Sequence, residues 1–258
     1  MAYRDMLVYL DAADDTLARL SLAVTMARAH GARLTGVDAS AEAAFFGAWA
    51  DKALHIASQF ETAVKEAGLE SRFVSADEAR VAGGERRHCV DLIIASRYEG
   101  EARGLVRAEI PDAVLMAAGA PLLLLPERWN PAPVGENVVV AWNGSREATR
   151  AVHDAMPLLA KAKKVTLFSF SSRSSARRSS SELLADHLAR HGVAARISDW
   201  IDTGDLSALE ALFASLDTQD ADLIVSGAFG HSRLFESLFG SVSRDLLRQP
   251  TTPILMSH

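Results

Sequence analysis

The chain has 258 residues, 49% hydrophobic and 23% charged, which is the composition of a soluble globular protein and not of a disordered or fibrous one. Its formal charge of −6 argues against a nucleic-acid surface, because phosphate backbones are held mainly by clustered Lys and Arg. The single cysteine, Cys89, excludes an internal disulfide and is expected to be half-buried. No apolar run approaches the length of a membrane span, and the first residues show no signal-peptide pattern. We therefore expect a cytoplasmic protein whose partners are small ligands or proteins.

Short apolar strands alternate with helices in the first half. Strands are predicted at 6–10, 32–37, 71–75, 90–96 and 121–125. A helix is predicted over 14–31, with Leu17, Leu20, Val24 and Ala27 on its buried face, and a second over 50–68. Glycine ends both helices.

The second half has the same alternation. Strands are predicted at 138–142, 164–170, 195–201, 222–226 and 253–257, and helices at 146–160, 180–191 and 205–216. The serine- and arginine-rich segment 169–182 is predicted to be a mobile loop before the second of these helices. A less favoured alternative is that its Arg173, Arg177 or Arg178 closes over phosphates.

The two halves resemble each other. Asp11 aligns with Asn143, Asp91 with Asp222 and Pro121 with Pro253, always at an offset of 131 or 132 residues. The repeat predicts two domains, 1–128 and 135–258, joined by a proline-containing linker. Apolar strands separated by amphipathic helices predict that each domain is a doubly wound open parallel sheet of the α/β class. Ligands of such sheets bind beyond the carboxyl ends of the strands.

A glycine-rich stretch follows the strand predicted at 222–226. Gly227 and Gly230 free backbone N–H groups to face an anion, and Gly240 and Ser241 precede a predicted helix whose N-terminus attracts phosphate. Ser243 adds a hydroxyl donor. The alternative is that the glycines only make a turn and that Ser241 only caps a helix.

The series Gly227, Gly230, Gly240, Ser241, with nine residues between the second and third glycines, resembles the ATP-binding signature of the universal stress protein family. Each half resembles one domain of that family, and the whole chain resembles its tandem members. The resemblance implies Rossmann-like domains, similar to adenine nucleotide alpha hydrolases, that pack about a pseudo-twofold axis. It also implies a cytoplasmic stress-response protein that binds ATP, accompanied by Mg²⁺ where the triphosphate needs it.

The two halves differ in the residues that the resemblance makes important. The first half has Ser96 and Glu99 where the second has its first two glycines, so only the second half is expected to hold a nucleotide. Family ATP binders carry Asp near the adenine, whereas the second half has the neutral Asn143. His231, within the glycine-rich stretch, faces either a phosphate or solvent.

The resulting hypothesis is that the second domain binds ATP or a related adenine nucleotide as a regulatory ligand, through Asn143, Gly227, Gly230, His231, Gly240, Ser241 and Ser243. One alternative is a slow ATP-hydrolysing or adenylyl-transfer enzyme, although the sequence offers no catalytic base or nucleophile. Another is a scaffold without nucleotide. A homodimer or a protein partner fits each of these.

Three further features have simpler interpretations. Asp11, Asp14 and Asp15 form an acidic cluster that suits acid/base chemistry or Mg²⁺, but the simpler expectation is that Asp14 or Asp15 caps the first helix. Trp142, at a strand end, is expected to pack more than to stack on a base. His187 and His191 have metal-ligand spacing on one helix, but no third ligand is near them in sequence, so a partly exposed helix face is expected.

Overall fold

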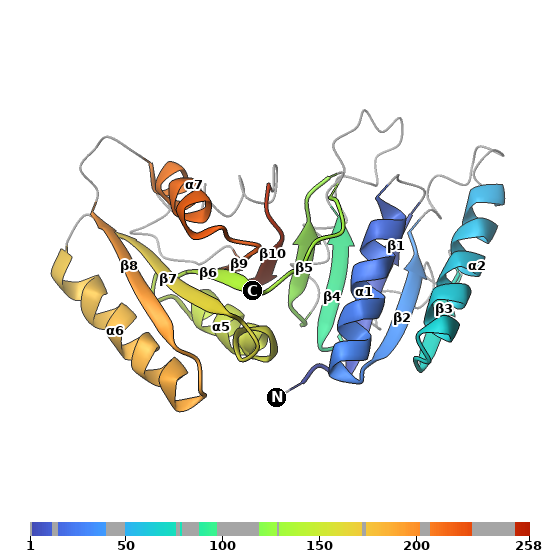
Figure 1. Cartoon of the computed structure of the whole chain (residues 1–258), viewed down its shortest axis with the longest axis horizontal. Coiled ribbons are helices and arrows are strands. Elements are labelled where there is room, and N and C mark those ends of the chain that lie inside the picture. Colours follow the sequence, from blue (N-terminus) through green and yellow to red (C-terminus); the bar gives the residue numbers. More distant parts are fainter. Residues whose placement is uncertain are drawn as a thin grey trace. The chain divides into compact units, whose positions relative to one another are not determined.

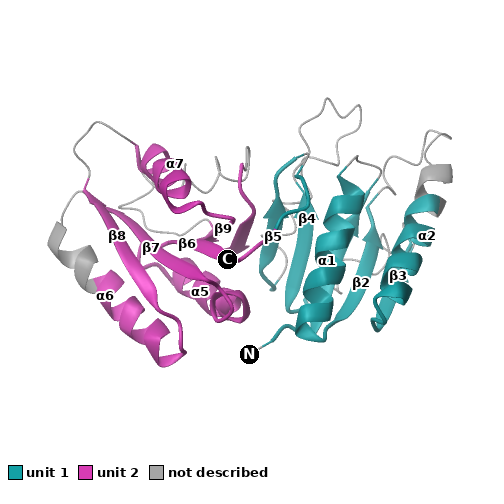
Figure 2. Cartoon of the chain, in the orientation of Figure 1, with its two compact units in different colours: residues 1–132 teal, residues 133–258 magenta. Residues whose placement is uncertain are grey.

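The computed structural model of the chain describes residues 2–11, 15–39, 50–75, 78, 88–96, 119–127, 129–171, 174–201, 207–228 and 251–258. The chain divides into two compact units, Met1–Ala132 and Pro133–His258 (Figure 2). The division falls in the proline-containing segment between the two repeats.

Unit 1 is a parallel sheet with helices (Figure 1). Its strands lie in the order β3-β2-β1-β4-β5. The elements are β1 (Asp5–Leu10), α1 (Thr16–His30), β2 (Arg33–Asp38), α2 (Ala50–Glu66), β3 (Ser71–Val74), β4 (Leu92–Ser96) and β5 (Leu122–Leu125).

Unit 2 repeats this arrangement with the strand order β10-β9-β6-β7-β8, again parallel. Within it, α5 and α6 lie on one side of the sheet and α7 on the other (Figure 1). The elements are β6 (Asn137–Ala141), α5 (Arg146–Leu159), β7 (Lys164–Ser171), α6 (Ser174–Arg190), β8 (Ala195–Ile201), α7 (Ala208–Gln219), β9 (Leu223–Gly227) and β10 (Ile254–Ser257). The predicted doubly wound α/β class is confirmed.

The central strands form the core of each unit. Every residue of β5 and of β10 is buried, as are the first four of β4 and of β9. Strands covered on both faces read as continuous apolar runs, which is why the sequence located them well.

The buried face of α1 differs from the prediction. Leu20 and Ala27 are buried as expected, but Leu17 is 53% exposed. The sheet is instead contacted by a face that includes Arg19 and Ala23, of which Arg19 is 2% exposed. Leu17 and Val24 line a groove of about 530 Å³ between α1 and α2. The apolar periodicity is misleading here because a charged residue lies on the buried face.

The serine-rich segment of unit 2 is not the predicted loop, because α6 begins at Ser174 and not near residue 180. Ser181 is fully buried, and its hydroxyl donates to Asp199 Oδ1 of β8 at 3.2 Å. Leu184 and Leu188 continue the same buried face. Small serines satisfied by hydrogen bonds can therefore occupy a helix face that an apolar pattern does not reveal.

The exposure of the single cysteine and the length of the helices bear on two expectations from composition. Cys89 is exposed and not half-buried. In the described part of the chain, the helices are too short or too polar to cross a membrane.

The aligned residues Asp91 and Asp222 have the same structural role in their own units. Asp91 Oδ2 accepts hydrogen bonds from the N–H groups of Arg4 and Asp5 at 2.6 and 3.0 Å. The carboxylate of Asp222 accepts three, from Gly135, Glu136 and Asn137, at 2.8–3.1 Å. Each carboxylate thereby ties the start of the first strand to the strand beside it, so the internal repeat extends to individual hydrogen bonds.

Candidate functional site

The candidate site of unit 2 lies at the carboxyl ends of β6 and β9. These strands are parallel neighbours, with Val140 opposite Val225 and Ala141 opposite Ser226. From β6 the chain continues to β7 on one side, whereas β9 lies on the other side. This reversal of strand order is the switch point at which doubly wound sheets bind ligands.

Asn143 follows β6 and shapes the turn into α5. Its side-chain Oδ1 accepts a hydrogen bond from the N–H of Ser145 at 3.0 Å. Gly144 between them has φ of +73°, a left-handed conformation that favours glycine. Asn143 is half-buried, and its amide NH₂ is a donor that an aspartate at this position would lack.

Ser145 caps α5 and is absent from the residues predicted for the site. Its Oγ accepts the N–H of Ala148 at 3.1 Å. The signal in the sequence is Asn-Gly-Ser before an amphipathic run, which is a typical helix start. The positive end of the α5 dipole therefore lies directly after β6, where it favours a negatively charged ligand.

Gly227 ends β9 and packs tightly against the first turn of α5. A Cβ at this position would lie 2.4 Å from the backbone nitrogen of Ala148 and 2.5 Å from the carbonyl carbon of Glu147. Real Cβ atoms do not approach backbone so closely, so no other residue fits without a shift of the helix. This packing requirement is a structural reason for Gly227 that does not depend on a ligand.

Trp142 belongs to the wall of the site and not to an open stacking surface. It is 8% exposed, and its Nε1 donates to Ser180 Oγ of α6 at 2.9 Å. Its backbone N–H donates to the carbonyl oxygen of Phe168 in β7. The tryptophan therefore has the packing role expected of it.

A buried polar network fixes α6 against the strands next to the site. Asp199 Oδ1 accepts hydrogen bonds from Ser169 of β7 and Ser181 of α6, at 2.5 and 3.2 Å. The two serines are 1% and 0% exposed. No sequence pattern indicates this network, since its members lie up to 30 residues apart.

The remaining predicted site residues lie outside the described part of the chain. They are Gly230, His231, Gly240, Ser241 and Ser243. The same holds for Asp14 and Arg173, and for the side chains of Arg177 and Arg178, which belong to α6. Of the residues predicted to bind the nucleotide, the structure thus places two, Asn143 after β6 and Gly227 at the end of the neighbouring strand β9.

Unit 1 has an ion pair where unit 2 has neutral residues. Asp11 Oδ1 accepts from Arg19 Nη2 at 2.8 Å and from Thr16 Oγ1 at 2.7 Å. Arg19 also lies 3.7 Å from Asp15 Oδ2. Asn143 and Ala151 occupy the aligned positions of Asp11 and Arg19 in unit 2. Asp11 and Asp15 therefore neutralise a buried arginine, and Asp15, at the N-cap of α1, makes no side-chain cap hydrogen bond.

The end of β4 differs from the end of β9 in the same way. Ser96 lies where unit 2 has Gly227, since Leu92 and Leu223 both pair with the second residue of the first strand in their unit. Its hydroxyl is buried and has no hydrogen-bond partner among the described residues. The carboxyl edge of unit 1 thus differs from that of unit 2 at both strands.

Comparison with known proteins connects this architecture to one class. A universal stress protein of Archaeoglobus fulgidus DSM 4304 is similar over 98% of this chain and 97% of its own, with TM-score 0.73 and 14% identity. A proposed universal stress protein of Pseudomonas aeruginosa UCBPP-PA14 covers 99% and 93%, with TM-score 0.61 and 17% identity. Both span the two units, so the chain has the fold of two-domain universal stress proteins.

A sequence match to the same class covers part of unit 2. The sequence model of the universal stress protein family matches residues 201–258 of the chain. The matched residues form the last part of unit 2, and both units have the fold of these proteins, which confirms the predicted resemblance to tandem universal stress proteins. A single-domain universal stress protein solved in complex with cAMP is similar over 47% of this chain at 26% identity, with TM-score 0.37. A comparison with curated proteins gives no match.

Proposed function

We propose that unit 2 binds ATP or a related adenine nucleotide at the carboxyl ends of β6 and β9, as a regulatory ligand of a cytoplasmic stress-response protein. The observation that carries the proposal is the position of Gly227, the first residue of the glycine series, beside Asn143 at the switch point of the sheet. The family match over residues 201–258 includes the whole series.

Each ligand residue has a physical role in this proposal. Gly230, Gly240, Ser241 and Ser243 supply backbone N–H groups and hydroxyls to phosphate oxygens, without a lysine. His231, in the same stretch, adds a donor. Asn143 faces the base edge with an amide that both donates and accepts. Mg²⁺ accompanies the phosphates when a triphosphate is bound.

We expect one nucleotide per chain. In unit 1 the carboxylate of Asp11 is already occupied by Arg19 and Thr16, and Ser96 replaces the first glycine. A ligand there would have to break a buried ion pair, which leaves an uncompensated charge. In this proposal, a protein partner or a second copy of the chain recognises the nucleotide-bound form.

The first experiment is the identification of small molecules released when the freshly purified full chain is denatured. It is followed by calorimetric titration of ATP, with and without MgCl₂, into the stripped protein. We expect about one adenine nucleotide per chain. Gly230→Asp should abolish binding through its bulk and charge, and Asn143→Ala should weaken it about tenfold, which is the loss of one hydrogen bond of about 1.4 kcal/mol.

The matched control is the double variant Asp11→Asn, Arg19→Ala, which gives unit 1 the aligned residues of unit 2 and should leave ATP binding unchanged. Absence of nucleotide and of heat would overturn the proposal and favour a scaffold. Binding that persists in Gly230→Asp, or that is lost in a folded double variant, would place the site elsewhere. Conversion of added ATP to ADP by the highly purified wild type and not by Gly230→Asp would make the nucleotide a substrate.

A further inference from the structure

Three histidines from two helices of unit 2 lie side by side. The rings of His187 and His191 have their centroids 4.9 Å apart and meet edge to face. The ring of His153, on α5, has its centroid 5.5 Å from that of His187 on α6. The third imidazole absent from the local sequence is therefore supplied by the neighbouring helix.

These separations fit imidazoles that share one metal ion. A metal–nitrogen bond of about 2.0 Å plus the ring radius puts each centroid about 3.2 Å from the metal, so two ligands at about 90–120° have centroids about 4.5–5.5 Å apart. Both observed values fall in this interval. His187 contacts each of the other two histidines and would be the central ligand.

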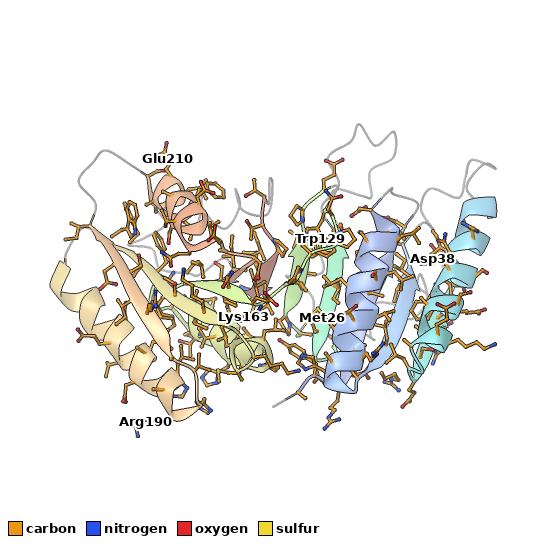
Figure 3. The ribbon with its side chains drawn as sticks, viewed as in Figure 1. Met26, Asp38, Trp129, Lys163, Arg190 and Glu210 are labelled. Carbon is orange, nitrogen blue, oxygen red and sulfur yellow. The ribbon has the colours of Figure 1, made fainter. Side chains whose placement is uncertain are left out.

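The arginines nearest to the histidines in sequence are each paired with a carboxylate, whereas Arg146 lines a pocket together with His153. Arg150 and Arg190, the nearest cationic neighbours in sequence, are paired with Asp154 and Asp186 at 3.2 and 2.9 Å. His187 and Arg190 lie in the last turn of α6, which ends near Arg190 (Figure 3). The negative end of the helix dipole, which favours cations, is located here.

We propose that His153, His187 and His191 form a binding site for a divalent transition-metal cation that joins α5 to α6. Imidazole is a good ligand for Zn²⁺, Ni²⁺ and Cu²⁺ and a poor one for Mg²⁺, so these metals define the ligand class. His191 follows the end of α6, which leads to the start of β8, so the site lies away from the carboxyl edge that holds Asn143.

Binding requires the rings to turn toward one point. Within the residues that the structure describes, no three His, Cys, Asp or Glu side chains are already placed to hold a metal ion. His153 and His191 are exposed and His187 is half-buried, so their rings can change rotamer at small cost. The cation is expected to fix rings that otherwise rotate, with water in the remaining coordination positions.

The test is calorimetric titration of NiCl₂ into the full chain without an affinity tag or nucleotide at pH 7.5. We expect one Ni²⁺ per chain, and no change when MgCl₂ is present. His187→Ala should abolish binding, while His153→Ala and His191→Ala should each weaken it at least tenfold.

The controls use positions outside the cluster. His55→Ala removes an exposed histidine of unit 1, and Cys89→Ser removes the exposed thiol; neither should change the affinity. His187→Gln and far-UV circular dichroism guard against a variant that fails to fold. Absence of a Ni²⁺ site, a site that survives His187→Ala and His187→Gln, or affinity unchanged in His153→Ala would overturn the three-histidine site.

Discussion

Position 227 requires glycine, because a side chain there would clash with the backbone of α5. Gly227→Ala places a methyl group against the backbone of α5, which cannot yield as a flexible side chain does. We expect unit 2 to lose about 1–3 kcal/mol of stability, the usual cost of overpacking. Urea unfolding followed by tryptophan fluorescence in a Trp49→Phe, Trp129→Phe background measures it, because the remaining tryptophans belong to unit 2.

Gly119→Ala is the matched substitution, since nothing lies within 4 Å of its added methyl group. It should change the unfolding midpoint of the full chain little. A Gly227→Ala variant as stable as the parent would show that the close approach to α5 is not required.

Arg19 and Asp11 allow a direct test of a buried ion pair. Arg19→Ala leaves the carboxylate of Asp11 without its guanidinium and opens a cavity, so we expect unit 1 to lose about 3–5 kcal/mol. Asp11→Asn together with Arg19→Ala reproduces the residues of unit 2, Asn143 and Ala151, and should recover part of this loss. A double-mutant cycle measures the coupling, and strictly additive losses would contradict the pair's importance.

At the level of elements, α7 begins with a reciprocal cap that makes it sensitive to pH. Ser207 Oγ accepts the N–H of Glu210 at 3.2 Å, and the Glu210 carboxylate accepts the N–H of Ser207 at 2.8 Å. Glu210 lies on the first turn of α7 (Figure 3). Ser207→Ala should cost about 1 kcal/mol, measured by urea unfolding of unit 2.

The hydrogen bonds from Ser207 lower the pKa of Glu210 below its ordinary 4.5. The carboxylate therefore stabilises the fold above pH 4.5, and this contribution is lost as the pH falls through the lowered pKa. Glu210→Gln should flatten the dependence of unfolding temperature on pH between about 3 and 5. An unchanged profile in Glu210→Gln would show that the cap does not titrate.

The elements predicted best from the sequence are the strands that are apolar along most of their length. The buried strands β4, β5, β9 and β10 are continuous apolar runs, and each lies within two residues of its predicted range. The start of α6 was missed, because residues 174–179 are Ser, Ala and Arg and contain no apolar repeat that would indicate a helix.

Some features of the candidate site could be predicted from the sequence, and others could not. The internal repeat and the glycine spacing are enough to indicate Asn143 and Gly227, since both follow directly from strand ends. The contact of Gly227 with α5 and the approach of His153 to His187 depend on how helices pack, which spacing along one chain does not contain.

At the level of the whole molecule, Asp91 and Asp222, the aspartates at aligned positions, should each stabilise their own unit by a similar amount. Asp222→Ala leaves three backbone N–H groups at the start of β6 without their acceptor, and Asp91→Ala leaves two at the start of β1, so we expect about 2–3 kcal/mol of destabilisation in the unit concerned. Urea unfolding of the full chain measures it. Asp217→Ala, at an exposed position of α7, is the control.

Asp222 also gives unit 2 a pH dependence of opposite sign to that of Glu210. Burial raises the pKa of Asp222 above its ordinary 3.8, against the effect of the backbone hydrogen bonds. Its titration thus favours folding most below pH 3.8, and that contribution is lost as the pH rises through the raised pKa. A carboxyl resonance of Asp222 that titrates at or below 3.8 in the folded chain would contradict this direction.

The aspartate hydrogen bonds have a consequence for synthesis on the ribosome. In each unit the bond spans 87 positions, from Arg4 to Asp91 and from Gly135 to Asp222, and the first strand made is the central one of its sheet. One neighbour of that strand, β4 in unit 1 and β9 in unit 2, is made only after most of the unit has been translated. Until then, the edge of the strand that this neighbour will cover is open to other chains. Nascent chains halted before Asp222 should therefore be more prone to proteolysis and aggregation than chains halted only a few dozen residues later.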